Sequence, residues 1–204
     1  MKRRIEKTVY LFDSRGNPAE VYNSETEATQ KQKTVFDWCS SIMASFVVIF
    51  VIFCFLFRVV QVSGSSMLQT LKNGDWLIVS SVGDDIRFGD IVVATSPTYD
   101  GGPVIKRVIG VEGDEIYIDF DRGEVLVNGV VLDEPYINTP TNIRYDVEFP
   151  VTVPENCVFL MGDNRNGSLD SRSTTIGMVE EEYVLGRVIT RILPFEKIDY
   201  INLR

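Results

Sequence analysis

Cys39 to Phe57 read CSSIMASFVVIFVIFCFLF, a run of 19 residues that contains no charged side chain. A helix of about 20 apolar residues is long enough to cross the hydrocarbon core of a bilayer. About 38 mostly polar residues precede the run and Arg58 follows it directly, whereas a cleavable signal peptide has its apolar stretch near the start and small residues after it. We therefore predict a permanent transmembrane helix over residues 39–57, rather than a cleaved leader or the buried core helix of a soluble protein.

Positive charge is concentrated before this run. Residues 1–38 carry seven Lys or Arg, whereas the first fifteen residues after the run carry only Arg58 and Lys72. Because the cytoplasmic flanks of membrane helices hold the excess of positive charge, we predict a polar cytoplasmic tail over residues 1–38. The chain after the helix then lies outside the cytoplasm, and the protein is a single-pass protein of the cell membrane.

The chain after the apolar run is acidic and poor in metal-binding side chains. Residues 58–204 hold 13 basic and 23 acidic residues, a net charge of about −10, which argues against nucleic acid as a partner. The sequence has no histidine, and of its three cysteines only Cys157 lies beyond the run. We therefore expect no disulfide framework, no metal and no cofactor.

The pattern beyond the run is typical of β-structure. Runs of β-branched residues alternate with turn signals, and Asn128-Gly129 between two apolar stretches predicts a tight hairpin. Residues 133–155 hold four of the eight prolines and read as an extended excursion. The strands that we expect are Trp76–Val82, Asp90–Thr95, Val104–Val111, Glu115–Phe120, Glu124–Leu132, Val158–Met161 and Tyr183–Ile192.

The predicted fold class is mostly β. A single N-terminal transmembrane helix is followed by an extracytoplasmic all-β domain with an inserted smaller β region. The β core of this domain comprises residues 58–112 and 156–193. Residues 113–155 form the inserted hairpin and loop subdomain, and residues 194–204 form a C-terminal tail.

Three serines lie together shortly after the apolar run, in SGSSMLQTL at residues 63–71. A serine becomes a nucleophile when a neighbouring base takes its proton, and without histidine that base is a lysine, a carboxylate or a terminal amine. Burial lowers the pKa of a lysine and so makes it a base. Among the lysines after the run, Lys72 and Lys197 lie in polar stretches, whereas Lys106 lies in PVIKRVIGV. Lys106 is therefore the candidate base; the alternative is an edge-strand lysine that points to solvent.

Three stretches resemble the motifs of bacterial type I signal peptidases. SGSSMLQTL is similar to their serine box, and KRVIGVEGD at residues 106–114 is similar to their lysine box. GDNRNGSLDSR at residues 162–172 is similar to their third box. The resemblance covers residues 37–193, and Gly64, two positions before the serine of the box, is typical of the Gram-positive members.

The resemblance implies a serine endopeptidase with a Ser-Lys dyad. Ser66 matches the nucleophile and Lys106 its general base, while Ser168 matches a serine that orients the lysine. The Ser66 backbone N–H matches one donor to the oxyanion, and the second donor stays open. The expected substrates are secretory preproteins whose signal peptides have small residues at the first and third positions before the cut.

The resemblance also implies two ion pairs, Arg107 with Asp163 and Asp170 with Arg172, that hold the lysine strand and the third box together. Two positions depart from the family pattern: Gln69 and Glu112 stand where the boxes have proline.

Other readings stay open at this point. One is a specialised paralogue that processes a single secreted or surface protein. Another is a catalytically weak relative that acts as an assembly factor. A soluble, self-cleaving Ser-Lys peptidase shares the dyad, but the apolar run argues against it. The stretch FRVVQV before the serine box either skims the membrane interface or forms the first strand beside an extended substrate.

Overall fold

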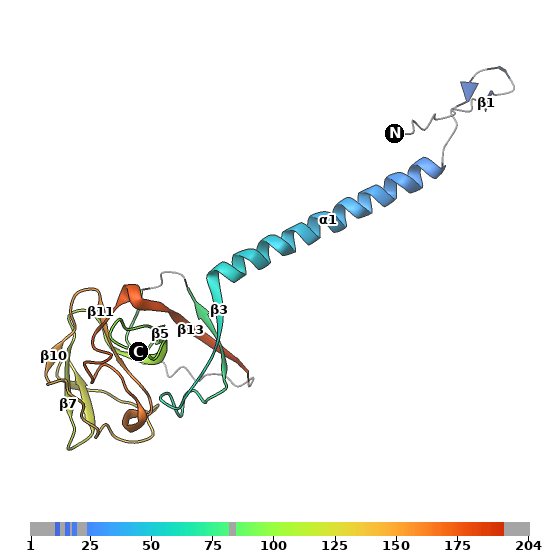
Figure 1. Ribbon diagram of the computed structural model, residues 1–204. Coiled ribbons are helices and arrows are strands. Elements are labelled where there is room, and N and C mark those ends of the chain that lie inside the picture. Colours follow the sequence, from blue (N-terminus) through green and yellow to red (C-terminus); the bar gives the residue numbers. More distant parts are fainter. Residues whose placement is uncertain (1–10, 13–14, 17, 20–23, 82–84, 194–204) are drawn as a thin grey trace. The chain divides into compact units, whose positions relative to one another are not determined.

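The computed structural model describes residues 11–12, 15–16, 18–19, 24–81 and 85–193 (Figure 1). The chain divides into two compact units, Met1–Ile52 and Phe53–Arg204. The C-terminal tail predicted for residues 194–204 lies outside the described residues.

The long helix α1 spans Ser24–Leu56 and follows a short antiparallel pair, β1 (Leu11–Phe12) and β2 (Pro18–Ala19). It starts well before the apolar run because the preceding segment is rich in helix-forming Glu, Gln, Lys and Ala. Its section from Lys31 to Leu56 is long and apolar enough to span a membrane, and none of that stretch is buried in the described structure. Water solvates such an apolar surface poorly, so α1 has the physical properties of a membrane span.

The second unit is a β domain, which confirms the predicted mostly β fold with one N-terminal apolar helix. Its main sheet has seven strands in the order β12-β11-β6-β5-β13-β4-β3, and all pairings are antiparallel. These strands are β3 (Phe57–Gln61), β4 (Trp76–Ser80), β5 (Ile91–Ala94), β6 (Val104–Gly110), β11 (Cys157–Met161), β12 (Val179–Glu180) and β13 (Val184–Leu193). The stretch FRVVQV thus supplies an edge strand of this sheet.

A smaller sheet lies within residues 113–155, with the order β10-β7-β8-β9. Asn128 and Gly129 have φ angles of 53° and 77°, as a type I′ hairpin turn requires at both central residues. The stretch Glu124–Leu132, predicted as one strand, is therefore two strands on either side of the predicted Asn128-Gly129 turn. The strands are β7 (Glu115–Asp119), β8 (Glu124–Val127), β9 (Val130–Val131) and β10 (Val151–Thr152).

The two sheets share apolar contacts rather than folding around separate cores. One buried cluster joins Ile116 and Val125 of the small sheet to Phe159 and Met161 of β11. A second cluster joins strands of the main sheet to Met67, in the loop that carries the serines. Packing of this kind fixes both the insert and the serine loop on the main sheet.

Gly186 on β13 should be intolerant of a side chain. A Cβ atom at this position would lie 2.0 Å from the Ser80 carbonyl oxygen, which is backbone on the neighbouring strand β4. We expect Gly186→Ala to lower the free energy of unfolding by about 2 kcal/mol or more in chemical denaturation, because the strands must separate locally.

The matched control is Gly110→Ala on β6. A Cβ atom there would first meet the flexible end of the Ile116 side chain, which can move, so the loss should be clearly smaller. Equal losses for the two variants would contradict the backbone clash as the cause.

Candidate active site

The loop between β3 and β4 carries the three serines and is closed by its own backbone. The Val62 N–H donates to the Asp75 carbonyl at 2.8 Å, and the Gly74 N–H donates to the Val62 carbonyl at 2.9 Å. Met67, directly after Ser66, is buried in the core. Ser66 is therefore held at the boundary between core and solvent by its own neighbour, and it is half-buried.

Lys106 lies on β6, paired with Val92 of β5, and only 3% of its surface is exposed. Its Nζ atom lies 2.8 Å from Ser66 Oγ, although the two residues are 40 positions apart in the sequence. The structure therefore brings the two candidate residues into hydrogen-bond contact and turns the lysine inward instead of toward solvent.

Burial lowers the pKa of Lys106 from 10.5 to about 8, because an ammonium group loses hydration in the protein interior. Asp170 raises this pKa and Arg172 lowers it, so the two charges of that pair act in opposite directions. Desolvation is the largest effect. At neutral pH an appreciable fraction of Lys106 is then neutral and able to accept a proton.

The third box packs directly against the serine loop. The Asn164 N–H donates to the Ser66 carbonyl at 3.0 Å, and the Asn164 amide donates to the Ser65 carbonyl. A Cβ atom on Gly162 would lie 2.2 Å from Ser168 Oγ and 2.5 Å from the Ser66 carbonyl oxygen. Glycine at position 162 therefore allows this close approach.

Both expected charge pairs are present and buried. Arg107 contacts Asp163 through two hydrogen bonds of 2.8 and 2.7 Å, and Asp163 also accepts from the Thr70 hydroxyl on the serine loop. Asp170 contacts Arg172 through bonds of 2.8 and 2.9 Å. These charge-assisted contacts link the lysine strand, the serine loop and the third box.

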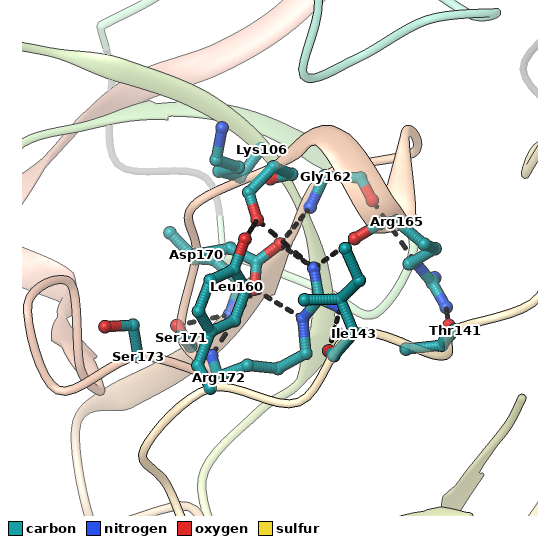
Figure 2. A network of polar contacts seen from close by, with 12 residues as sticks. Lys106, Thr141, Ile143, Leu160, Gly162, Arg165, Asp170, Ser171, Arg172 and Ser173 are labelled. Carbon is teal, nitrogen blue, oxygen red and sulfur yellow. Dashed lines mark hydrogen bonds and ion pairs between the residues drawn. The ribbon is translucent and has the colours of Figure 1, made fainter. Parts of the chain in front are cut away.

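Asp170 and Arg172 also lie at the centre of a wider polar network, which Figure 2 shows. Asp170 accepts the Gly162 N–H at 3.0 Å, and Arg172 donates to the carbonyl of Ile143. Both members of the pair are fully buried, so their contacts with each other and with these backbone groups must replace the hydration that the charges lose.

Ser168 is buried next to Gly162, with 1% of its surface exposed. Its carbonyl oxygen accepts hydrogen bonds from Tyr145 and Arg172. Within the described chain, its hydroxyl is buried without a hydrogen-bond partner. The orienting role of Ser168 toward Lys106 therefore stays a prediction.

Sequence reasoning missed a second layer of this network. Arg165 is completely buried and donates to Glu134 at 2.7 Å, and the Tyr136 ring lies 4.0 Å from the Arg107 guanidinium carbon. Tyr136 also donates its hydroxyl proton to Glu134. The available sequence signal was the pair Glu134 and Tyr136 on either side of Pro135, in a segment that was predicted to be extended and irregular.

The two departures from the family pattern lie outside the immediate site. Gln69 is exposed. Glu112 is also exposed, and its carboxylate accepts the backbone N–H of Asn156 at 2.9 Å. Asn156 has a φ angle of 56°, so Glu112 supports a tight turn before β11.

A cavity of about 580 Å³ opens beside Ser66 and Lys106. It is lined by β3, the serine loop, the start of β6 and the segment before it, with Leu169 and Leu185 on other walls. Its walls are largely small or aliphatic side chains. Among the described residues, no group of three or more His, Cys, Asp or Glu side chains could hold a metal ion.

Known proteins resemble this chain over most of its length. Residues 35–193 match the family model described as signal peptidase, peptidase S26. The chain is 33% identical over 186 residues to signal peptidase I of Bacillus licheniformis, covering 86% of this chain and 97% of the relative. It is 30% identical over 189 residues to signal peptidase IB of Staphylococcus aureus (strain MRSA252), covering 83% and 95%. A crystal structure of a signal peptidase I from Enterococcus faecalis V583 is 32% identical, with a TM-score of 0.43, and covers 53% of this chain and all of that one.

The lowered pKa of Lys106 should appear in the pH dependence of stability. Lys106 loses its proton near pH 8 in the folded protein and near pH 10.5 in the unfolded chain. Between these values the unfolded chain binds one more proton, so the free energy of unfolding rises with pH across this window. Lys106→Met has no titrating group at this position, so its free energy of unfolding should exceed that of the wild type by the largest amount below pH 8. This difference in the free energy of unfolding should decrease by about 3 kcal/mol between pH 7 and pH 11, measured by chemical denaturation. A difference that is constant with pH would mean that the pKa is not lowered.

Proposed function

The chain belongs to the signal peptidase family, peptidase S26, and on that basis we propose that it is a membrane-anchored serine endopeptidase that removes signal peptides from exported preproteins. The observation that carries the chemistry is the 2.8 Å contact between Ser66 Oγ and the buried Lys106 Nζ, in a chain without histidine. The only other type of base within the nearby network is a carboxylate, and each of its carboxylates is already paired with an arginine.

In the proposed mechanism, neutral Lys106 accepts the Ser66 proton while Oγ attacks the peptide carbonyl. The tetrahedral intermediate collapses when the Lys106 ammonium returns that proton to the leaving amine. This step breaks the peptide bond and leaves the signal peptide as an ester on Ser66. Lys106 then takes a proton from water, whose oxygen attacks the ester. As the acyl–Oγ bond breaks, the Lys106 ammonium returns this proton to Ser66 Oγ, which releases the signal peptide with a new carboxyl group and restores the dyad.

The oxyanion of each intermediate needs donors that are not already engaged. In the described chain, the Ser66 N–H donates no hydrogen bond to another protein group, which supports its role as one donor. The adjacent carbonyl oxygens of Ser65 and Ser66 are fixed by Asn164, and this restrains the peptide plane that presents the N–H. The second donor is left open.

Ser168 is proposed to orient Lys106, and the two buried pairs to keep the lysine strand aligned with the nucleophile loop. The support for Ser168 is its burial beside the Ser66 carbonyl and its hydroxyl without a partner in the described chain. A hydrogen bond with Lys106 would satisfy that hydroxyl, as buried polar groups require.

The proposed location is the cell membrane, with the N-terminus in the cytoplasm and the β domain at the outer face. The excess of Lys and Arg before the apolar run supports this orientation. Ser66 follows Arg58 by eight residues, so even an extended chain keeps it within about 26 Å of the end of the span. A signal peptide presents its cleavage site at that level, because its apolar segment is in the membrane and small residues precede the cut.

The substrate is proposed to bind as an added strand along β3, which lies at the edge of the main sheet and lines the cavity. A free sheet edge offers backbone donors and acceptors to any extended peptide, and the shallow apolar wall then selects small side chains.

The dyad is tested with the full-length protein in detergent and a preprotein that has an Ala-x-Ala cleavage site. Ser66→Ala and Lys106→Ala should each lower kcat/KM by about a thousandfold or more, because the residues act as one unit. Lys72→Ala, an exposed lysine of the same domain, should stay within about twofold of the wild type. Unchanged cleavage in either dyad variant, with its thermal unfolding intact, would rule the dyad out.

The pH dependence of cleavage tests lysine as the base. With the pKa of Lys106 at about 8, the neutral fraction rises about tenfold per pH unit below that value. We therefore expect kcat/KM to increase from pH 6 and to level off above pH 8 to 9. A flat profile between pH 6 and 9, measured where the protein stays folded, would contradict this assignment.

A further inference from the structure

Arg58 is part of the wall of the active-site cavity. It lies on β3, and the alternation of a strand places its side chain on the same face as that of Val60. Both residues line the cavity, as does Val62, which directly follows β3. Arg58 is thus the first of three cavity-lining positions that lead along the chain toward Ser66.

The charge of this cavity is unusual for the domain. Residues 58–204 hold 23 acidic and 13 basic residues, yet among the described residues that line the cavity there is no Asp or Glu. The cationic residues of this described lining are Arg58 and Lys106, and the pKa of Lys106 is lowered to about 8. Arg58 is exposed, and it forms no ion pair within the described part of the chain. Within the described part of the chain, the cavity therefore presents one permanent positive charge that has no ion-pair partner.

The direction of the substrate follows from the order of the chain. Arg58 is the first charged residue after the apolar run, so it lies at the membrane end of β3. A signal peptide with its apolar segment in the bilayer must approach Ser66 from that end. Its residues before the cut then lie along Val62, Val60 and Arg58 in that order.

The spacing of strands sets which substrate residue meets Arg58. Same-face residues repeat every second position on both strands, roughly 6.6 Å apart. If the small residues at the first and third positions before the cut lie against Val62 and Val60, Arg58 lies beside roughly the fifth. The length of the arginine side chain widens this to positions four to seven.

From these observations we propose that Arg58 is a specificity-determining residue that selects signal peptides with a carboxylate about five residues before the cut. This inference rests on the proposed function. The recognised class of ligand is an acidic peptide segment between the apolar run of the signal peptide and its small residues. An exposed ion pair of this kind changes kcat/KM by about two- to fivefold.

The test uses the full-length protein in neutral detergent and peptides that end in an Ala-x-Ala site. Each pair of peptides differs by a single Glu or Lys, placed in turn at positions four to eight before the cut. The wild type should prefer Glu over Lys by about two- to fivefold near position five, with the preference fading in high salt. Arg58→Glu should invert the preference at the same position.

The matched control is Arg122→Glu, which makes the same change of charge at an exposed arginine that does not line the cavity. It should keep the wild-type preference. Equal cleavage of the Glu and Lys peptides by the wild type, or a preference unchanged in Arg58→Glu, would overturn the inference. A loss in Arg58→Gln that is the same for all peptides and appears only in vesicles with anionic lipid would also overturn it, since Arg58 would then bind lipid phosphate.

Failure of the proposed function has a different signature, namely no cleavage of any peptide by the wild type. In that case, the Glu and Lys peptides are labelled with a fluorophore and their binding to the Ser66→Ala variant is compared instead. A Glu preference in binding that Arg58→Glu inverts supports the inference without cleavage, and equal binding of the Glu and Lys peptides overturns it.

Discussion

The burial of one amine is the constraint on which the rest of this domain depends. Lys106 is placed on a central strand with 3% of its surface exposed, at a cost in hydration that the fold must recover elsewhere. Two nearby carboxylates, Asp163 and Asp170, raise the pKa of Lys106, and each is paired with an arginine. Arg172, the partner of Asp170, lowers this pKa. The Asp170–Arg172 pair thus acts on Lys106 with opposing charges, and burial decides the direction of the shift.

Much of this arrangement could be predicted from the sequence, because it lies in short local patterns. The apolar run, the Asn128-Gly129 hairpin and most β-branched strands are set by periodicity and turn chemistry within a few residues. The pairing of Ser66 with Lys106 is different, since it joins distant strands. The absence of histidine and the apolar strand around one lysine singled out Lys106, whereas Ser66 was distinguished from its neighbouring serines only by the resemblance to the serine box.

The remainder could not be predicted, since it depends on contacts between distant segments. Glu134 and Tyr136 flank a proline in a segment rich in polar residues, and this local pattern does not indicate that they pack against buried arginines. Likewise, the edge strand β3 begins at Phe57, directly after the helix. The chain changes from helix to strand at this point because it pairs with β4, which the local sequence does not show. Local propensity is weak at such positions, and tertiary pairing overrides it.

The shared core of the two sheets limits how this domain can change. Ile116 and Val125 of the insert pack in the same cluster as Phe159 and Met161 of β11, and β11 ends one residue before Gly162, which touches the serine loop. The insert is therefore a supporting wall of the candidate active site and not a detachable module. A change of volume in its interior is transmitted through one strand to the loop that carries Ser66, whereas its surface loops can change without that effect.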